Sequence, residues 1–115
     1  MGYMVHHTIV VSSCIDDLLD KAYSKAQEIF GDQVSNVVES KINGYRSFFI
    51  APDGSKDGWK DSDAGNMRRD EFVAWLDEQR YEDGSTSLGW VEVQFNDDER
   101  DTKVVRDSDG ALRTF

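Results

Sequence analysis

Four arginines and three aromatic residues are the side chains of this sequence best suited to hold a ligand or a partner. A guanidinium group binds phosphate or carboxylate through two parallel hydrogen bonds, and aromatic rings stack on nucleobases or anchor protein interfaces. The candidate binding residues are Tyr45, Arg46, Trp59, Arg68, Arg69, Arg80 and Trp90. Neighbouring helical residues diverge by roughly 100°, so Arg68 and Arg69 are not expected to face the same way. The alternative for these two arginines is a solvated, charged helix face.

The two histidines, His6 and His7, are adjacent in the sequence. Adjacent residues of a strand point to opposite faces, so this pair is not expected to chelate a metal together. We expect His7 to be a hydrogen-bonded core histidine. A hydrolase or transferase that uses Asp or Glu with His7 stays open as an alternative, and it requires a carboxyl of raised pKa beside the histidine.

Residues 53–64 resemble a calcium-binding loop in part. Oxygen donors stand at positions 1, 3, 5 and 9 of the twelve-residue EF-hand pattern, and Gly58 stands at position 6. Ala64 occupies position 12, where the pattern needs a bidentate glutamate. Phosphate-binding glycine loops, nucleophile elbows and zinc-type Cys/His clusters are absent from the sequence. We therefore predict no catalytic residue, no metal and no cofactor.

The charge of the chain is strongly negative. The 115 residues include 13 Lys and Arg against 23 Asp and Glu, a net charge of −10. Residues 52–115 alone hold 17 acids and nine bases. Such a surface repels phosphate, which disfavours nucleic-acid binding, and it suits a partner with a basic surface; the alternative is that the charge serves solubility alone.

The length predicts one domain, residues 1–115. Cys14 is the only cysteine, so no internal disulfide forms, and we expect it to be inert and partly buried. No apolar run approaches the roughly 20 residues that span a membrane, so no membrane association is predicted.

Hydrophobic periodicity predicts two helices and five strands. The first helix covers residues 13–30, with a capping box from Ser13 to Asp16 and Gly31 as its terminator. The second covers residues 66–81, with Asp63 as a cap, and follows a polar loop over residues 52–65. Strands are predicted over residues 3–12, 34–42, 45–51, 88–95 and 102–107, and Asn43-Gly44 predicts a type I′ hairpin turn between the second and third.

The order β-α-β-β-α-β-β predicts an α+β fold, with an antiparallel or mixed sheet and both helices on one face. Our topology prediction is a ferredoxin-like arrangement with an added strand. Trp90 alternates with Val91 and Val93; if its sheet face is uncovered, Trp90 is an exposed aromatic residue that would favour a homodimer.

Several segments resemble a group of small, uncharacterised proteins encoded by bacteriophages and prophages. They are residues 5–11 (VHHTIVV), 43–50 (NGYRSFFI), 52–56 (PDGSK), 68–72 (RRDEF) and 79–85 (QRYEDGS). The resemblance implies the cytoplasm of an infected bacterium and brings no catalytic residues.

The sequence thus leaves three hypotheses for function. The first is a binding protein that interferes with a host or defence protein through an acidic face. The second is a sponge for a nucleotide-like small molecule, held by the arginines and aromatic residues. The third is the small hydrolase or transferase that uses His7.

Overall fold

The computed structural model describes residues 5–54, 60–96 and 102–109. These residues form a sheet of five strands and two α-helices. In chain order the elements are β1 (Val5–Ser13), α1 (Asp16–Phe30), the short 3-10 helix η1 (Gly31–Gln33), β2 (Val38–Glu39), β3 (Arg46–Ile50), α2 (Lys60–Glu78), β4 (Gly89–Asn96) and β5 (Lys103–Asp107).

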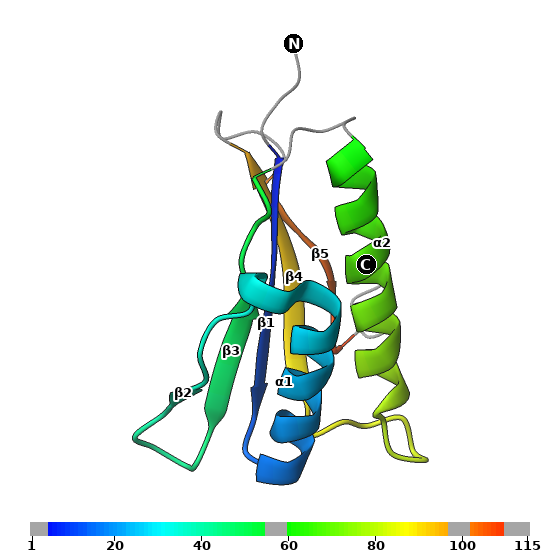
Figure 1. The fold of residues 1–115 in the computed structure, drawn as a ribbon. Helices are drawn as coiled ribbons and strands as arrows, with labels where there is room; N and C mark the ends of the chain where they lie inside the picture. Colours follow the sequence, from blue (N-terminus) through cyan, green and yellow to red (C-terminus); the bar gives the residue numbers. More distant parts are fainter. Residues whose placement is uncertain (1–4, 55–59, 97–101, 110–115) are drawn as a thin grey trace.

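Every pairing in the sheet is antiparallel, and the strand order in space is β2-β3-β1-β4-β5. This order differs from the order along the chain, with β1 at the centre. Both helices lie against one face of the sheet, which gives two layers (Figure 1). The prediction of an α+β fold is therefore confirmed, with an antiparallel sheet.

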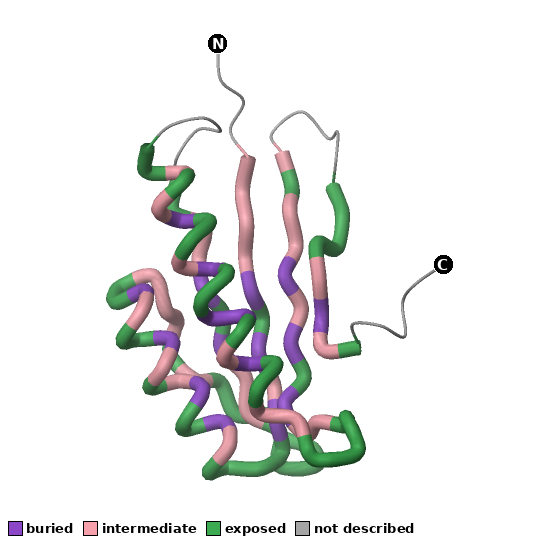
Figure 2. Tube along the Cα trace, turned by 90° about the vertical axis from the view of Figure 1, so that its right-hand side faces the viewer, coloured by how far each residue is buried: buried purple, intermediate pink, exposed green. Residues whose placement is uncertain are grey.

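The hydrophobic core lies between the helices and the sheet (Figure 2). Alternate residues of β1 enter it, with Ile9 and Val11 fully buried, because successive strand residues point to opposite faces. The helices contribute residues at helical spacing, such as Leu19 and Ala22 of α1 and Phe72 of α2, all at 0 % exposure. This core fixes which side of each strand faces the helices and which side does not.

Helix α1 begins later than the sequence predicts. Its N-cap is Ile15, which supplies no side-chain hydrogen bond, so the predicted capping box is wrong. The Ser13 hydroxyl instead accepts a hydrogen bond from the Ile15 N–H and donates one to the Ser87 carbonyl. At the other end Gly31, with φ of 58°, ends the helix as predicted.

The hairpin before α2 has the predicted turn but a shorter first strand. Asn43 and Gly44 adopt φ of 60° and 68°, the positive values that an Asn-Gly turn allows. The first strand, β2, has only two residues where the sequence pattern covered nine.

Helix α2 begins at Lys60, earlier than predicted, so Asp63 is a residue of its first turn and not its cap. The prediction started after Gly65 because glycine disfavours helix interiors. A Cβ atom at this position would lie 2.5 Å from the Asp53 Oδ2 atom and 3.2 Å from the Arg69 Nη1 atom. The glycine therefore leaves room for a carboxylate beside the helix. Among the described residues, no helix has the length and apolar character needed to cross a bilayer.

Candidate functional site

Carboxylates crowd the outer surface of the helix layer. Because the apolar stripes of α1 and α2 face the sheet, most of their charged residues point to solvent, with the buried Arg69 as an exception. Within the described part of the chain, eight exposed carboxylates have no ion-pair partner: Asp17, Asp32, Asp61, Asp63, Glu71, Glu78, Glu82 and Asp83, of which Asp83 accepts hydrogen bonds from Ser85. Most of them belong to the two helices, so the negative potential is concentrated on this side of the molecule.

A shallow, open groove of about 580 Å³ runs between the two helices. Its walls are five residues of α1 and one of α2, namely Asp20, Lys21, Ser24, Lys25, Glu28 and Trp75. The Trp75 ring is half-buried and lies parallel to the Phe72 ring, with centroids 6.5 Å apart, so the core holds it in place. A fixed indole face in a groove is a surface on which a cation can rest.

Acidic residues surround this groove. The Lys25 ammonium group lies 3.0 Å from the Glu28 carboxylate, and the hydrogen bond to Glu28, followed by the charges of Glu71 and Glu78, raises the pKa of Lys25. Glu71 and Glu78 precede and follow Trp75 by about one turn of α2. The groove therefore combines an aromatic wall with more carboxylates than ammonium groups, since Lys21 and Lys25 stand beside Asp20, Glu28, Glu71 and Glu78.

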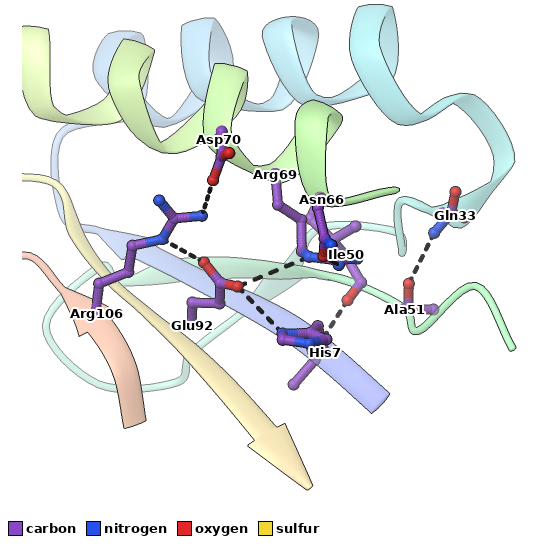
Figure 3. A network of polar contacts seen from close by, with 10 residues as sticks. His7, Gln33, Ile50, Ala51, Asn66, Arg69, Asp70, Glu92 and Arg106 are labelled. Carbon is purple, nitrogen blue, oxygen red and sulfur yellow. Dashed lines mark hydrogen bonds and ion pairs between the residues drawn. The ribbon is translucent and has the colours of Figure 1, made fainter. Parts of the chain in front are cut away.

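A second polar cluster lies inside the protein, between the sheet and α2 (Figure 3). At its centre is Glu92 of β4, whose side chain is 2 % exposed. Its carboxylate accepts a hydrogen bond of 2.6 Å from the Arg106 Nε–H and one of 3.3 Å from the His7 Nδ1–H. The Arg69 Nε atom lies 3.7 Å from the same carboxylate. One buried anion thus meets cationic or donor groups from β1, β5 and α2.

The charges in this cluster stabilise one another. Burial by itself raises the pKa of Glu92, but hydrogen bonds from His7 and Arg106 and their charges outweigh it, so the pKa is lowered and the carboxylate is ionised. Burial lowers the pKa of Arg69, and the negative charges of Glu92 and Asp53 oppose this effect. Arg106 also donates to the Asp70 carboxylate over 2.8 Å. The cluster therefore fastens the first half of α2 to the sheet.

His7 is hydrogen-bonded and largely buried, with its side chain 18 % exposed. The hydrolase or transferase hypothesis required a neighbouring carboxyl of raised pKa, whereas the pKa of Glu92 is lowered. Through these contacts Glu92 and His7 support the packing of α2 on the sheet, and the hydrolase or transferase hypothesis stays a prediction.

The predicted binding residues do not come together in one place. Arg46 pairs with Asp20 of α1 at 2.9 Å, and Arg69 is buried beside Glu92. Arg80 pairs with Asp77 at 2.7 Å and donates to the Gly84 and Ser108 carbonyls. These three guanidinium groups serve different parts of the fold, so they do not form one phosphate-binding cluster.

The aromatic residues of that prediction are also spread out. Trp90 is 6 % exposed and faces the helices, so the condition under which it would be an exposed aromatic residue, an uncovered sheet face, is not met. Tyr45 is 45 % exposed beside the hairpin. Arg68 is half-buried on α2, and Trp59 lies outside the described residues. Cys14 is exposed, so the expectation of a partly buried cysteine is wrong.

Residues 60–64 of the segment that resembles a calcium loop are helical, and residues 55–59 lie outside the described ranges. Across residues 5–54, 60–96 and 102–109, no group of three or more His, Cys, Asp or Glu side chains is arranged to hold a metal ion. No protein-family model, curated protein or solved structure matches this chain.

The sequence pattern missed Glu92 and the groove at Trp75. Glu92 lies between Trp90 and Gln94 on one face of β4, while Val91, Val93 and Phe95 occupy the other. The valine face has the higher hydrophobicity, yet the structure turns the Trp90 and Glu92 face toward the helices. The available signal was the arginine pair Arg68 and Arg69, in the middle of α2, which offered the buried carboxylate a partner.

Proposed function

We propose that this chain is a binding protein that holds a basic surface of another protein on its helix layer, at the groove beside Trp75. The observation that carries the proposal is an aromatic wall flanked by Glu71 and Glu78, on a surface rich in unpaired carboxylates. A lysine or arginine of the partner rests on the indole face, and the carboxylates supply the opposite charge.

The class of partner follows from the resemblance to phage-encoded proteins. Under this proposal the partner is a host or defence protein in the bacterial cytoplasm, and binding interferes with its activity. The negative helix layer steers such a partner and speeds association at low ionic strength. The nucleotide hypothesis has less support, because Arg46, Arg69 and Arg80 each serve a separate contact within the fold.

A pull-down from bacterial lysate tests the proposal with a charge-reversed groove. The variant Glu71→Lys/Glu78→Lys places two cations beside Trp75 and should lose the proteins that the unmodified chain captures. The matched control is Asp61→Lys/Glu82→Lys, which makes the same change in net charge in the first turn of α2 and in the loop that follows the helix. Mass spectrometry of the eluates identifies the proteins that depend on the groove.

The control should keep those proteins, and raising the salt concentration should release them from the unmodified chain because screening weakens exposed charge pairs. Equal capture by the groove variant and the unmodified chain would contradict the proposal. Retention in high salt would contradict the electrostatic part of it.

For the finer topology we propose the ferredoxin-like arrangement extended by β5. The neighbour order β2-β3-β1-β4, with one helix after β1 and one after β3, supports this description.

A further inference from the structure

The face of the sheet that the helices leave open is apolar. Its central row runs across three strands, because Val10 of β1 pairs with Phe49 of β3 and with Val91 of β4. A second row joins Thr8 to Val93 and Val104, and His6 pairs with Phe95 in a third. Phe49, Val104, Val10 and Phe95 are 45 %, 49 %, 38 % and 37 % exposed. Such a continuous apolar surface marks an interaction site.

The polar groups on this face are already satisfied within the chain. The Ser12 and Ser47 hydroxyls hydrogen-bond to each other over 2.7 Å, and the Thr8 hydroxyl donates to the Ile50 carbonyl over 2.7 Å. The His6 ring packs on the Phe95 ring, with centroids 4.9 Å apart. When this face is buried, these three hydroxyls keep their hydrogen bonds. Their burial therefore does not carry the free-energy cost of an unsatisfied polar group.

Charge decides which occupant fits. No charged side chain of β1, β3 or β4 lies on this face, since Arg46 and Glu92 point to the helix side. At its edge Asp107, the register partner of Val91, is 8 % exposed and accepts the Asp109 N–H. Because its three central strands carry no charged side chain on this side, the face offers no ionic contact to a charged partner and does not repel a second copy of the chain.

We infer that two copies of this chain associate face to face through these open sheet surfaces. Two stacked sheets lie about 10 Å apart, so the helix layers end up outermost, roughly 30 Å from each other. That separation is several times the screening length of about 8 Å at physiological salt. The net charge of −10 on each chain therefore opposes this arrangement less than it opposes any other pairing of faces.

The area of the face suits a weak, reversible dimer. Strands spaced about 4.8 Å apart and rising about 3.4 Å per residue give the five strands a face of roughly 470 Å² per copy. Both copies together bury roughly 950 Å², which is the range of weak and transient interfaces. Because β1 is the central strand, the overlap is greatest when the two-fold axis passes over β1, which brings Val10 close to its copy.

Analytical ultracentrifugation of three chains tests this inference. The unmodified chain should sediment with twice the mass of one chain. Val10→Lys places two like charges near the two-fold axis and should raise the dissociation constant at least about 100-fold. Met67→Lys, at a side chain of α2 that is 72 % exposed, is the matched control and should leave the dimer intact. Circular dichroism checks that each variant keeps the fold.

A cysteine pair gives a second readout. In a Cys14→Ser background, Val10→Cys should form a disulfide between two chains on mild oxidation, whereas Met67→Cys should not. A chain that stays monomeric at the highest attainable concentration, or a Val10→Lys variant that dimerises as the unmodified chain does, overturns the inference. Neither result touches the proposed function, because the groove variants test the opposite face of the molecule.

Discussion

At the scale of single residues, Glu92 shows how one polar side chain organises the packing of a helix on a sheet. A lone carboxylate with 2 % exposure would be costly, and its ionised form persists because Arg106, His7 and Arg69 surround it. The negative charge of Glu92 also offsets the free-energy cost of burying the Arg69 guanidinium group. Removal of the central anion leaves two guanidinium groups close together without their shared counter-charge.

We therefore predict that Glu92→Gln lowers the free energy of unfolding by about 3 kcal/mol at neutral pH. Urea denaturation followed by tryptophan fluorescence measures this change. Asp17→Asn, which removes an exposed and unpaired carboxylate of α1, is the control and should change the stability by less than about 0.5 kcal/mol. An equal, small effect of both substitutions would show that the buried cluster does not stabilise the fold.

The same residue should set part of the acid sensitivity. The pKa of Glu92 is lowered in the folded protein, so its contribution to stability is present above the ordinary value of 4.5 and is lost as the pH falls through the lower, folded value. Stability measured as a function of pH should fall below that range in the unmodified chain. In Glu92→Gln this part of the decline should be absent, so the two curves converge in acid; parallel curves would contradict the assignment.

At the scale of elements, the first turn of α1 lacks a side-chain cap. Ile15 occupies the N-cap with an extended backbone and is 43 % exposed, so its side chain contributes little burial. Serine at this position accepts a hydrogen bond from a free N–H of the first turn. We predict that Ile15→Ser raises the free energy of unfolding by about 1 kcal/mol, measured by urea denaturation, while Ile15→Ala gives no such gain.

The hairpin turn offers an opposite test. Gly44 has φ of 68°, and nothing lies within 4 Å of a Cβ atom placed there, so the effect of a side chain is purely conformational. Gly44→Ala should lower the free energy of unfolding by about 1 kcal/mol, the cost of a left-handed backbone for an L-residue. Lys41→Ala, in the same loop, is the control; a neutral Gly44→Ala would show that the hairpin contributes little to stability.

The sequence predicted most of these elements from local signals and missed what depends on distant contacts. Gly31 and Asn43-Gly44 act through backbone geometry that their residue types determine, and both lie where expected. The start of α2 was predicted too late because a glycine usually disfavours the interior of a helix. Gly65 is tolerated there because it leaves space for the Asp53 side chain, which comes from a separate segment. Which side of β4 faces the helices was left open, since alternation shows that two faces exist and only packing decides which one the helices cover.

The site was less predictable than the fold for the same reason. Sequence patterns identify arginines that can bind ligands, but they do not show which arginines are already paired within the fold. Arg46 pairs with Asp20 and Arg69 lies beside Glu92, and both carboxylates come from other elements. Trp75 stands next to the apolar residue Leu76 in the sequence, and only the position of α1 shows that part of its ring borders a groove.

At the scale of the whole molecule, charge and apolar surface are separated onto opposite sides. The helix layer carries the unpaired carboxylates, whereas the open face of the sheet is uncharged across its three central strands. Such a concentration of like charge strains the folded state at low ionic strength. We predict that the melting temperature rises as sodium chloride is added up to about 0.15 M, where the screening length is about 8 Å.

Differential scanning fluorimetry measures this rise, and Asp17→Lys/Glu78→Lys should reduce it because the variant relieves part of the repulsion. A melting temperature that falls with salt would show instead that exposed ion pairs, such as Arg80 with Asp77, outweigh the net charge.

The two borders of the sheet are both poor templates for a further strand. One ends in β2, which has two residues, and the other in β5, whose pairing with β4 is interrupted by a bulge between Glu92 and Val93. Short or bulged borders discourage lateral hydrogen bonding between molecules. Even at high concentration the chain should therefore resist assembly into cross-β fibres. Neither edge strand presents a long, regular row of free backbone N–H and C=O groups to which another strand could pair.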